Sequence, residues 1–336
     1  MNRNDPGRSA WHSDQGSFLI VYLFLGIAKE TKKAFDLCVL CLCYIAPKYD
    51  IINETFGYGH TNRKETEAMS YLDPRHSEVD IRVMSSNILF DKTLPDRLPL
   101  IAEYYRNSDA DLIGMQEVNK VGTGLFDILA DLYAPVALRH PEDKHCFTPI
   151  LYRRDRYDLV EGGSELYRMR GTDTKSMAWA VLCDKSDGQK IALINSHGSL
   201  ILKAYNLEAT DAVEGEMWRV DNVRQMLEKK DALREKYGAS LPVFITGDFN
   251  SHMDRESIQN MKKVLPDSAD VATVSASTGI NSFHRVPGRP CDEGTPIDFI
   301  FVTDDAIQVL THHIPCDQTA LDISDHCPVY VDAKLK

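Results

Sequence analysis

The sequence contains no apolar run long enough to cross a bilayer as a helix. Its two apolar N-terminal runs, residues 18–28 and 37–46, are each about ten residues long, whereas a spanning helix needs about 20. The first run has the length of a signal-peptide core, but the leader before it mixes acidic with basic residues. We therefore predict no membrane span and a cytoplasmic protein, with secretion as the less favoured alternative.

The sequence also lacks a Lys/Arg-rich block of the kind that follows a phosphate backbone. Its 38 Lys and Arg residues stand against 50 Asp and Glu residues, which gives a formal net charge of −12. An acidic chain can still bind nucleic acid through a local patch, or bring cations to an anionic substrate. Nucleic acid is therefore an open but disfavoured partner. The composition is typical of a soluble globular protein, for which we expect a monomer.

A disulfide framework is missing as well, because the eight cysteines are scattered along the chain. This absence favours a reducing cytoplasm. The one close spacing is Cys38-x-x-Cys41-x-Cys43, which lies in an apolar run with no second Cys/His pair at zinc spacing. We interpret these three residues as buried thiols and not as a metal cluster.

Residues 1–79 differ from the rest of the chain and end in a polar, turn-rich stretch. We interpret them as an N-terminal extension of unknown role, either native or a non-native upstream segment. Residues 80–336 are predicted to form a single α/β domain, because strands and helices alternate irregularly there. Strands are predicted at residues 81–89, 112–115, 150–152, 178–183, 191–195, 297–302 and 329–333, and helices at residues 94–107, 214–236 and 255–264. A further strand leads into Ile-Thr-Gly-Asp-Phe-Asn, residues 245–250.

That hexapeptide carries Asp248 and Asn250 at the end of an apolar strand. Residues two apart on an extended strand point the same way, so both side chains face one pocket. Carboxylate and carboxamide oxygens suit a hard cation or an attacking water molecule. Alone, this pair leaves both possibilities open.

Other apolar strands end in an acid, an amide or an imidazole. Each such residue has a structural alternative, such as a turn cap, an exposed acid at a helix start or a structural histidine. Gathered at one edge of a packed sheet, however, they would be expensive to bury without a ligand. The residues are Asn87, Glu117, His197, Asp298 and the pair Asp325-His326.

Such a set supports metal-assisted attack of water on a phosphoester. Asn87 and Glu117 supply oxygen ligands for Mg²⁺, which neutralises phosphate charge. A histidine paired with a buried aspartate is a general base or a transition-state donor, and His326 with Asp298 fits this role.

The order of these motifs resembles that of the endonuclease/exonuclease/phosphatase superfamily, which includes pancreatic-type DNases, apurinic endonucleases, inositol 5-phosphatases, sphingomyelinases and deadenylases. The resemblance covers roughly residues 80–335. It implies a four-layer α/β/β/α sandwich with two packed mixed β-sheets. It also implies that Asn87 in Ser-Ser-Asn-Ile and Glu117 in Gln-Glu-Val lie on the metal side, where we also place Asp325.

The same resemblance assigns the remaining motifs. His197 in Asn-Ser-His-Gly matches the phosphate-contacting histidine, and Asp248 with Asn250 matches the pair that holds and orients the nucleophilic water. Asp298 matches the acid that orients the terminal histidine, which is His326. We therefore expect a phosphoester hydrolase that depends on Mg²⁺, with Mn²⁺ as the alternative.

The substrate stays open at this stage. The Asn195-Ser196-His197-Gly198 segment looks more like the phosphatase, sphingomyelinase and deadenylase branches than like the apurinic endonucleases. Gly198 replaces the usual Leu, so the neighbouring loop is expected to differ. A small-molecule, sugar or lipid-like phosphate is the leading interpretation, a DNA or RNA nuclease is the alternative, and an inactive binding module is a third.

A basic loop precedes the Asp298 strand. Its cations, His284, Arg285 and Arg289, are candidates for gripping a substrate phosphate. A solvated basic loop is an equally good interpretation.

Overall fold

The computed structural model describes residues 75, 77–137, 147–168, 175–200, 209–276 and 279–336. The two N-terminal apolar runs and Cys38, Cys41 and Cys43 lie outside the described residues, so their interpretations stay predictions. The division of the chain at residue 80 also stays a prediction. On the extension side of that boundary, Arg75 forms an ion pair with Asp111 at 2.7 Å, and Glu78 forms one with Lys334 at 2.8 Å.

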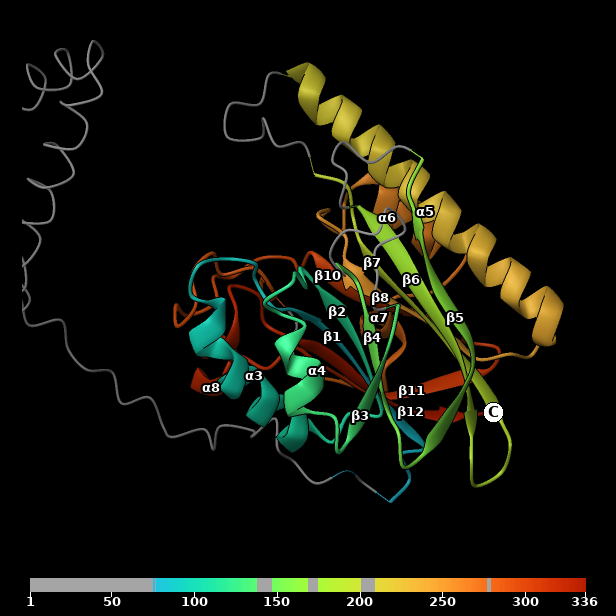
Figure 1. Ribbon diagram of the computed structural model, residues 1–336. Helices are drawn as coiled ribbons and strands as arrows, with labels where there is room; N and C mark the ends of the chain where they lie inside the picture. The colour runs from blue at the N-terminus through green and yellow to red at the C-terminus, as the bar shows by residue number, and fades with distance from the viewer. Residues whose placement is uncertain (1–74, 76, 138–146, 169–174, 201–208, 277–278) are drawn as a thin grey trace, which may run out of the picture. The chain divides into compact units, whose positions relative to one another are not determined.

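The larger of two β-sheets has seven strands in the order β3-β4-β2-β1-β12-β11-β9 (Figure 1). Its central strand β1 runs parallel to β2 and antiparallel to β12. The strands are, in that order, Tyr133–Val136, Ile150–Arg153, Leu112–Gln116, Ile81–Asn87, Val329–Leu335, Ile307–His313 and Val274–Ser275.

The smaller sheet has five strands in the order β10-β8-β7-β6-β5. Here β7 and β8 are parallel and the other neighbours are antiparallel, so both sheets are mixed. The strands are Asp298–Val302, Val243–Asp248, Lys190–His197, Ser176–Asp184 and Tyr157–Leu166.

The two sheets pack face to face, and helices cover their outer faces (Figure 1). Ile81 and Val83 of the larger sheet share one apolar core with Leu193, Phe244 and Ile300 of the smaller sheet. Helices α3, α4 and α8 cover the larger sheet, and α5 and α6 cover the smaller one. This arrangement confirms the predicted four-layer α/β/β/α sandwich. The helices are α3 (Leu94–Ser108), α4 (Gly124–Ile128), α5 (Ala209–Tyr237), α6 (Glu256–Lys262), α7 (Ser268–Val271) and α8 (Gln318–Ile323).

The sequence predicted the strands that are buried on both faces and missed those that are not. Every residue of β8 is buried, and its apolar start, Val243 to Ile245, marks it in the sequence. By contrast, β5 lies at a sheet edge, contains two glycines and is largely exposed, so no apolar pattern marks it. In α5, the side chain of Met217 is 56% exposed, so it lies outside the apolar stripe that packs on the smaller sheet.

Chain direction brings the predicted polar strand ends to one edge of the sandwich. The parallel pair β1 and β2 packs across the core against the parallel pair β7 and β8. The carboxyl ends of all four strands therefore meet, and the antiparallel strand β10 begins at the same edge. Within the part of the chain that the structure describes, no helix is long and apolar enough to cross a membrane.

Candidate active site

Two of the predicted site residues leave their strands in a left-handed backbone conformation. Glu117, just after β2, has φ 61°, and Asn250, two residues after β8, has φ 50°. This conformation is uncommon for a side chain such as Glu and costs about 1 kcal/mol. Strain of this kind collects at functional sites, where the surrounding structure holds it in place. The Phe90 backbone N–H donates to Glu117 Oε2 at 2.8 Å and helps to hold this carboxylate.

Asn87 lies between the two carboxylates of the cluster. Its Nδ2 donates to Asp248 Oδ2 at 3.1 Å and lies 3.4 Å from Glu117 Oε1. Its Oδ1 accepts the Leu89 backbone N–H at 3.0 Å, which sets the orientation of the amide. In this orientation the amide NH2 group faces the carboxylates. Asn87 would therefore offer its oxygen to a cation only after a flip of the side-chain amide.

His197, at the end of β7, faces the same carboxylates. Its Nε2 is 3.4 Å from Asp248 Oδ2 and 4.0 Å from Glu117 Oε1. Burial, followed by the charges of Lys175 and His326, holds the pKa of His197 well below its ordinary value. The imidazole is therefore neutral at neutral pH.

His326 has the opposite electrostatic environment. Its Nδ1 donates to Asp298 Oδ2 at 2.8 Å, and its Nε2 is 3.8 Å from Asp248 Oδ2. Burial lowers the pKa of His326, but the charges of Asp298 and Asp248 and the hydrogen bond to Asp298 outweigh it and raise that pKa to about 10. Ser282 Oγ also donates to Asp298 Oδ2, at 2.7 Å, and so supports the acid that orients the histidine.

Asp248 is the carboxylate shared by both histidines, and its side chain is almost fully buried. Burial and the charge of Asp298 raise the pKa of Asp248 to about 6, against the opposing charges of His326 and Lys175. Its Oδ1 accepts the Asn250 backbone N–H at 2.8 Å. At neutral pH Asp248 is thus an ionised acceptor with a raised proton affinity.

Asn250 is held by the turn that follows β7. Its Nδ2 donates to the Gly198 carbonyl at 3.0 Å, and the Gly198 N–H donates to the Asp248 carbonyl at 2.7 Å. A Cβ on Gly198 would lie 2.3 Å from the Phe249 carbonyl oxygen, closer than any ordinary contact. Only glycine fits at this position, because the two backbones approach so closely. This explains why the chain has Gly198 where the resemblance leads one to expect Leu.

The ligand atoms of these residues form two compact groups. Those of Glu117, His197 and Asp248 lie within 4.8 Å of one another, and so do those of Asp248, Asp298 and His326. The first group, with two carboxylates, fits a hard divalent cation. The second contains a histidine already engaged with two acids, which is typical of proton transfer or charge stabilisation.

Asp325 belongs to neither group, although it directly precedes His326 of the second group in the chain. Burial and the charge of Glu117 raise the pKa of Asp325, against the charge of His326. Its assignment to the metal stays a prediction.

The structure does not bring the basic loop cations into the cluster. His284, predicted to bind substrate, has no exposed surface, and its Nδ1 lies 3.0 Å from the Val286 carbonyl oxygen. This burial does not suit a phosphate contact from solvent. Arg285 and Arg289 are exposed, and Arg289 pairs with Asp292 at 3.3 Å. Their assignment to substrate stays a prediction.

Lys175 is a site residue that the sequence did not reveal. It precedes β6, and the pairing of Met177 with Ser196 brings it beside the end of β7. Burial lowers the pKa of Lys175 to about 8, although the charges of Asp248 and Glu117 act to raise it. In the sequence, Lys175 is only a lysine that precedes an apolar strand. Most lysines lie on the protein surface, so nothing marks this one as a site residue.

A cavity of about 610 Å³ lies beyond the ends of β8 and β10. It is lined by His252, Arg255, Asn281 and Thr295, among others. His252 Nδ1 and Thr295 Oγ1 are 3.1 Å apart and join the two segments that carry Asp248 and Asp298. The volume is in the usual range for a small-molecule site.

A family model described as the endonuclease/exonuclease/phosphatase family matches residues 84–326. No curated protein matches the chain. Among solved structures, an endonuclease/exonuclease/phosphatase from Bacteroides vulgatus is 22% identical, with a TM-score of 0.62, over 76% of this chain and 99% of its own.

Two other solved structures share this fold. A mannosyl-6-phosphatase from Bacteroides thetaiotaomicron is 23% identical, with a TM-score of 0.60, over 76% of this chain and 99% of its own. TDP2 from D. rerio, complexed with a single-stranded DNA product, is 17% identical, with a TM-score of 0.56, over 76% and 98% of the two chains.

Proposed function

The chain belongs to the endonuclease/exonuclease/phosphatase family, and on that basis we propose that it hydrolyses a phosphoester by divalent-metal-dependent attack of water. The observation that carries this proposal is the convergence of Glu117, His197, Asp248 and the Asp298–His326 pair at one edge of the two sheets. Each of these residues has a partner or an electrostatic environment that suits a separate part of the reaction.

Glu117 and Asp248 are the residues that would hold the cation, with Asn87 and Asp325 as further ligands. Carboxylate oxygens favour Mg²⁺, and Mn²⁺ is the alternative. When bound, the cation neutralises phosphate charge and activates the phosphorus for attack.

Asp248 and Asn250 hold the attacking water. The ionised Asp248, whose pKa is raised to about 6, accepts a hydrogen bond from water and takes up its proton as attack proceeds. His326 is the transition-state donor and not the base, because an imidazole with a pKa of about 10 already carries its proton at neutral pH. Asp298 keeps the Nδ1–H of His326 engaged, so that Nε2–H points at the substrate.

His197 and Lys175 bind the phosphate oxygens. The neutral His197 donates a hydrogen bond, and the Lys175 ammonium adds a buried positive charge beside it. Lys175 directly precedes β6, the strand that pairs with β7, and this position lets both residues contact the same phosphate.

We propose a small phosphoester, such as a sugar phosphate or a lipid-like headgroup, as the substrate. The cavity of about 610 Å³, whose lining residues follow β8 and precede β10, and the mannosyl-6-phosphatase activity of one structural relative support this class. A nuclease is the second candidate, supported by the DNA-bound TDP2 structure and opposed by the net charge of −12. We further expect a cytoplasmic monomer.

The test is a substrate panel with Mg²⁺ or Mn²⁺: sugar phosphates, bis-p-nitrophenyl phosphate, sphingomyelin, single-stranded DNA and plasmid DNA. The proposal expects turnover that EDTA abolishes and that falls at least about 1,000-fold in Asp248→Asn and His326→Gln. His313→Gln, which alters a histidine outside both ligand groups, is the matched control. Activity that survives both site substitutions would refute the mechanism, and activity on DNA alone would favour the nuclease.

A further inference from the structure

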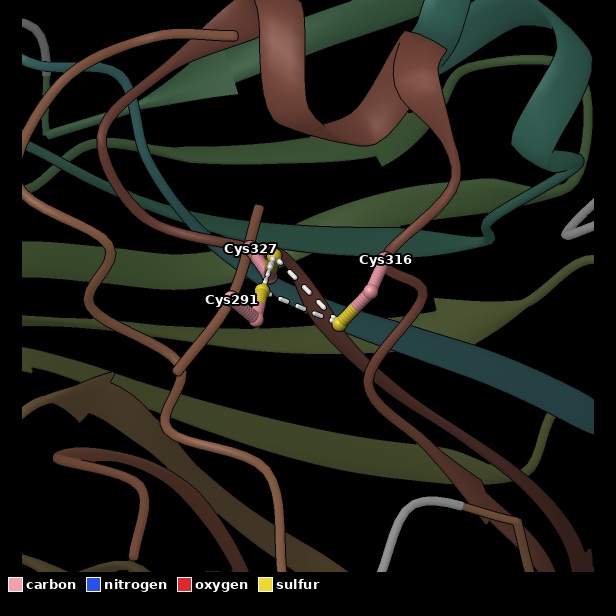
Figure 2. Close-up of side chains that lie close together, drawn as sticks. All are labelled: Cys291, Cys316 and Cys327. Atoms are coloured by element: carbon pink, nitrogen blue, oxygen red, sulfur yellow. Dashed lines mark hydrogen bonds between the residues drawn. The ribbon is translucent and has the colours of Figure 1, made fainter. Parts of the chain in front are cut away.

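Three cysteines that are far apart in the sequence bring their sulfur atoms together (Figure 2). Cys291 precedes β10, Cys316 precedes α8, and Cys327 precedes β12, so they are separated by 25 and 11 residues. The sulfur of Cys291 lies 3.1 Å from those of both Cys316 and Cys327, and the latter two are 3.7 Å apart. All three are free thiols, and Cys327 is fully buried.

A buried histidine in the basic loop before Cys291 is a candidate for a fourth donor. The His284 ring is fully buried, and its Nδ1 lies 3.0 Å from the Val286 carbonyl oxygen. Within the described residues, its Nε2 has no hydrogen-bond partner. A backbone carbonyl on one ring nitrogen is how metal-ligating histidines are usually oriented, because it fixes the tautomer and leaves the other nitrogen as a ligand. The ring nitrogens of His284 lie outside the group formed by the three sulfurs, so the ring must move toward them to complete a four-ligand site.

The sulfur geometry is nearer to that of a metal-thiolate site than to that of a disulfide. Zn–S bonds of about 2.3 Å in a tetrahedron separate the sulfurs by about 3.8 Å. The 3.7 Å edge matches this separation, and each 3.1 Å edge must open by less than 1 Å. A disulfide, with sulfurs about 2.05 Å apart, would require a closure of about 1 Å and would leave the third thiol unused.

We propose that Cys291, Cys316 and Cys327, with His284 as the fourth ligand, bind one Zn²⁺ ion in a closed structural site. Three thiolates and an imidazole are soft and borderline donors, which select zinc over the hard Mg²⁺ of the oxygen-rich group. Binding releases the thiol protons to solvent. This site shares no residue with the proposed phosphoesterase site, and its metal content is measured without any substrate.

The ion would also join the segments that carry catalytic groups. Cys327 follows His326 directly, and its N–H donates to the carbonyl of Ser282, the residue that hydrogen-bonds to Asp298. The His284 N–H in turn donates to the Asp325 carbonyl. A bound zinc ion would therefore hold the basic loop against the segment that carries His326.

The first test measures metal content. Full-length protein purified under reducing conditions, then dialysed against excess Mg²⁺, should retain about one zinc per chain by mass spectrometry of the metals. Cys291→Ser/Cys316→Ser should lower that content at least about 10-fold, whereas Cys183→Ser, which alters a free thiol outside the cluster, should keep it. Equal zinc content in all three proteins would overturn the proposal.

The second test uses the wild-type chain, so it does not depend on the folding of a variant. Titration of the zinc-free protein with Co²⁺ should produce thiolate-to-metal charge-transfer bands and the visible bands of a tetrahedral site, and one equivalent of Zn²⁺ should remove them. Octahedral Co²⁺ alone would overturn the proposal, and so would a mass lower by two hydrogens from a disulfide among the three cysteines. In His284→Asn, unchanged zinc affinity would overturn the assignment of the fourth ligand.

Discussion

Replacing Gly198 with alanine should damage catalysis, although it adds a single methyl group. The added Cβ would meet the Phe249 carbonyl oxygen at 2.3 Å and its carbonyl carbon at 2.6 Å. Ordinary contacts begin near 3.4 Å, so the two backbones must separate by about 1 Å. Neither contact atom can rotate away, because both belong to the main chain.

That separation acts directly on the groups that hold water. Asn250 Nδ2 donates to the Gly198 carbonyl, and the Gly198 N–H donates to the Asp248 carbonyl, so the same shift displaces both side chains. A misplacement of about 1 Å costs about 100-fold in rate, equivalent to about 3 kcal/mol in the barrier. Overpacking should also lower the free energy of unfolding by about 1–3 kcal/mol.

The assay compares kcat, KM and the free energy of unfolding for wild type and Gly198→Ala at saturating Mg²⁺. We expect the main loss in kcat, because the two displaced side chains, Asp248 and Asn250, are those that hold the attacking water. Gly124→Ala is the control, since its new Cβ would meet only the flexible Leu98 side chain, at 3.3 Å. A Gly198→Ala enzyme with wild-type kcat would refute the view that close backbone approach positions the water-holding pair.

The other predictions concern two charged groups. The folded pKa of His326, about 10, exceeds its unfolded value, so its contribution to stability is complete below about pH 6.5 and is lost as pH rises through 10. Asp298→Asn should lower this pKa by about 1–2 units, and urea unfolding in EDTA between pH 6 and about 10 would detect the shift; an unchanged pH dependence would contradict the pairing. Lys175→Met should lower kcat/KM about 10- to 100-fold and remove the decline in kcat/KM that we expect as the lysine, with a pKa of about 8, loses its proton. Because the substitution removes a buried charge, the melting temperature of the variant should not fall. A large fall in stability with unchanged kcat/KM would assign Lys175 a structural role.

The sequence predicted the residues whose local pattern reflects their environment. Strand β8 is buried throughout, begins with three apolar residues and runs into Gly-Asp-Phe-Asn, so both its burial and its functional end could be read directly. The edge strand β5 has no such pattern, because most of its side chains are exposed and it is held in the sheet by its backbone pairing with β6. Lys175 escaped notice for a related reason, since only the register of β6 on β7 brings it to the site.

Two interpretations changed because burial and distance are properties of the folded chain. His284 looked like a surface phosphate ligand in a basic loop, but its ring is fully buried. Cys291, Cys316 and Cys327 looked scattered, because their spacings of 25 and 11 residues match no metal motif.

From its residues alone the chain could be assigned its sandwich fold, its family and the strand ends that supply the reaction chemistry. Strand periodicity and motif order are local in sequence, and the carboxyl ends of parallel strands must meet at one edge. Only the folded structure decided that His326 is cationic while His197 is neutral, since each pKa depends on burial and on charges more than 20 residues away in the sequence. It alone brought three thiols into one cluster, because contacts between distant loops follow from packing and leave no periodic trace in the sequence.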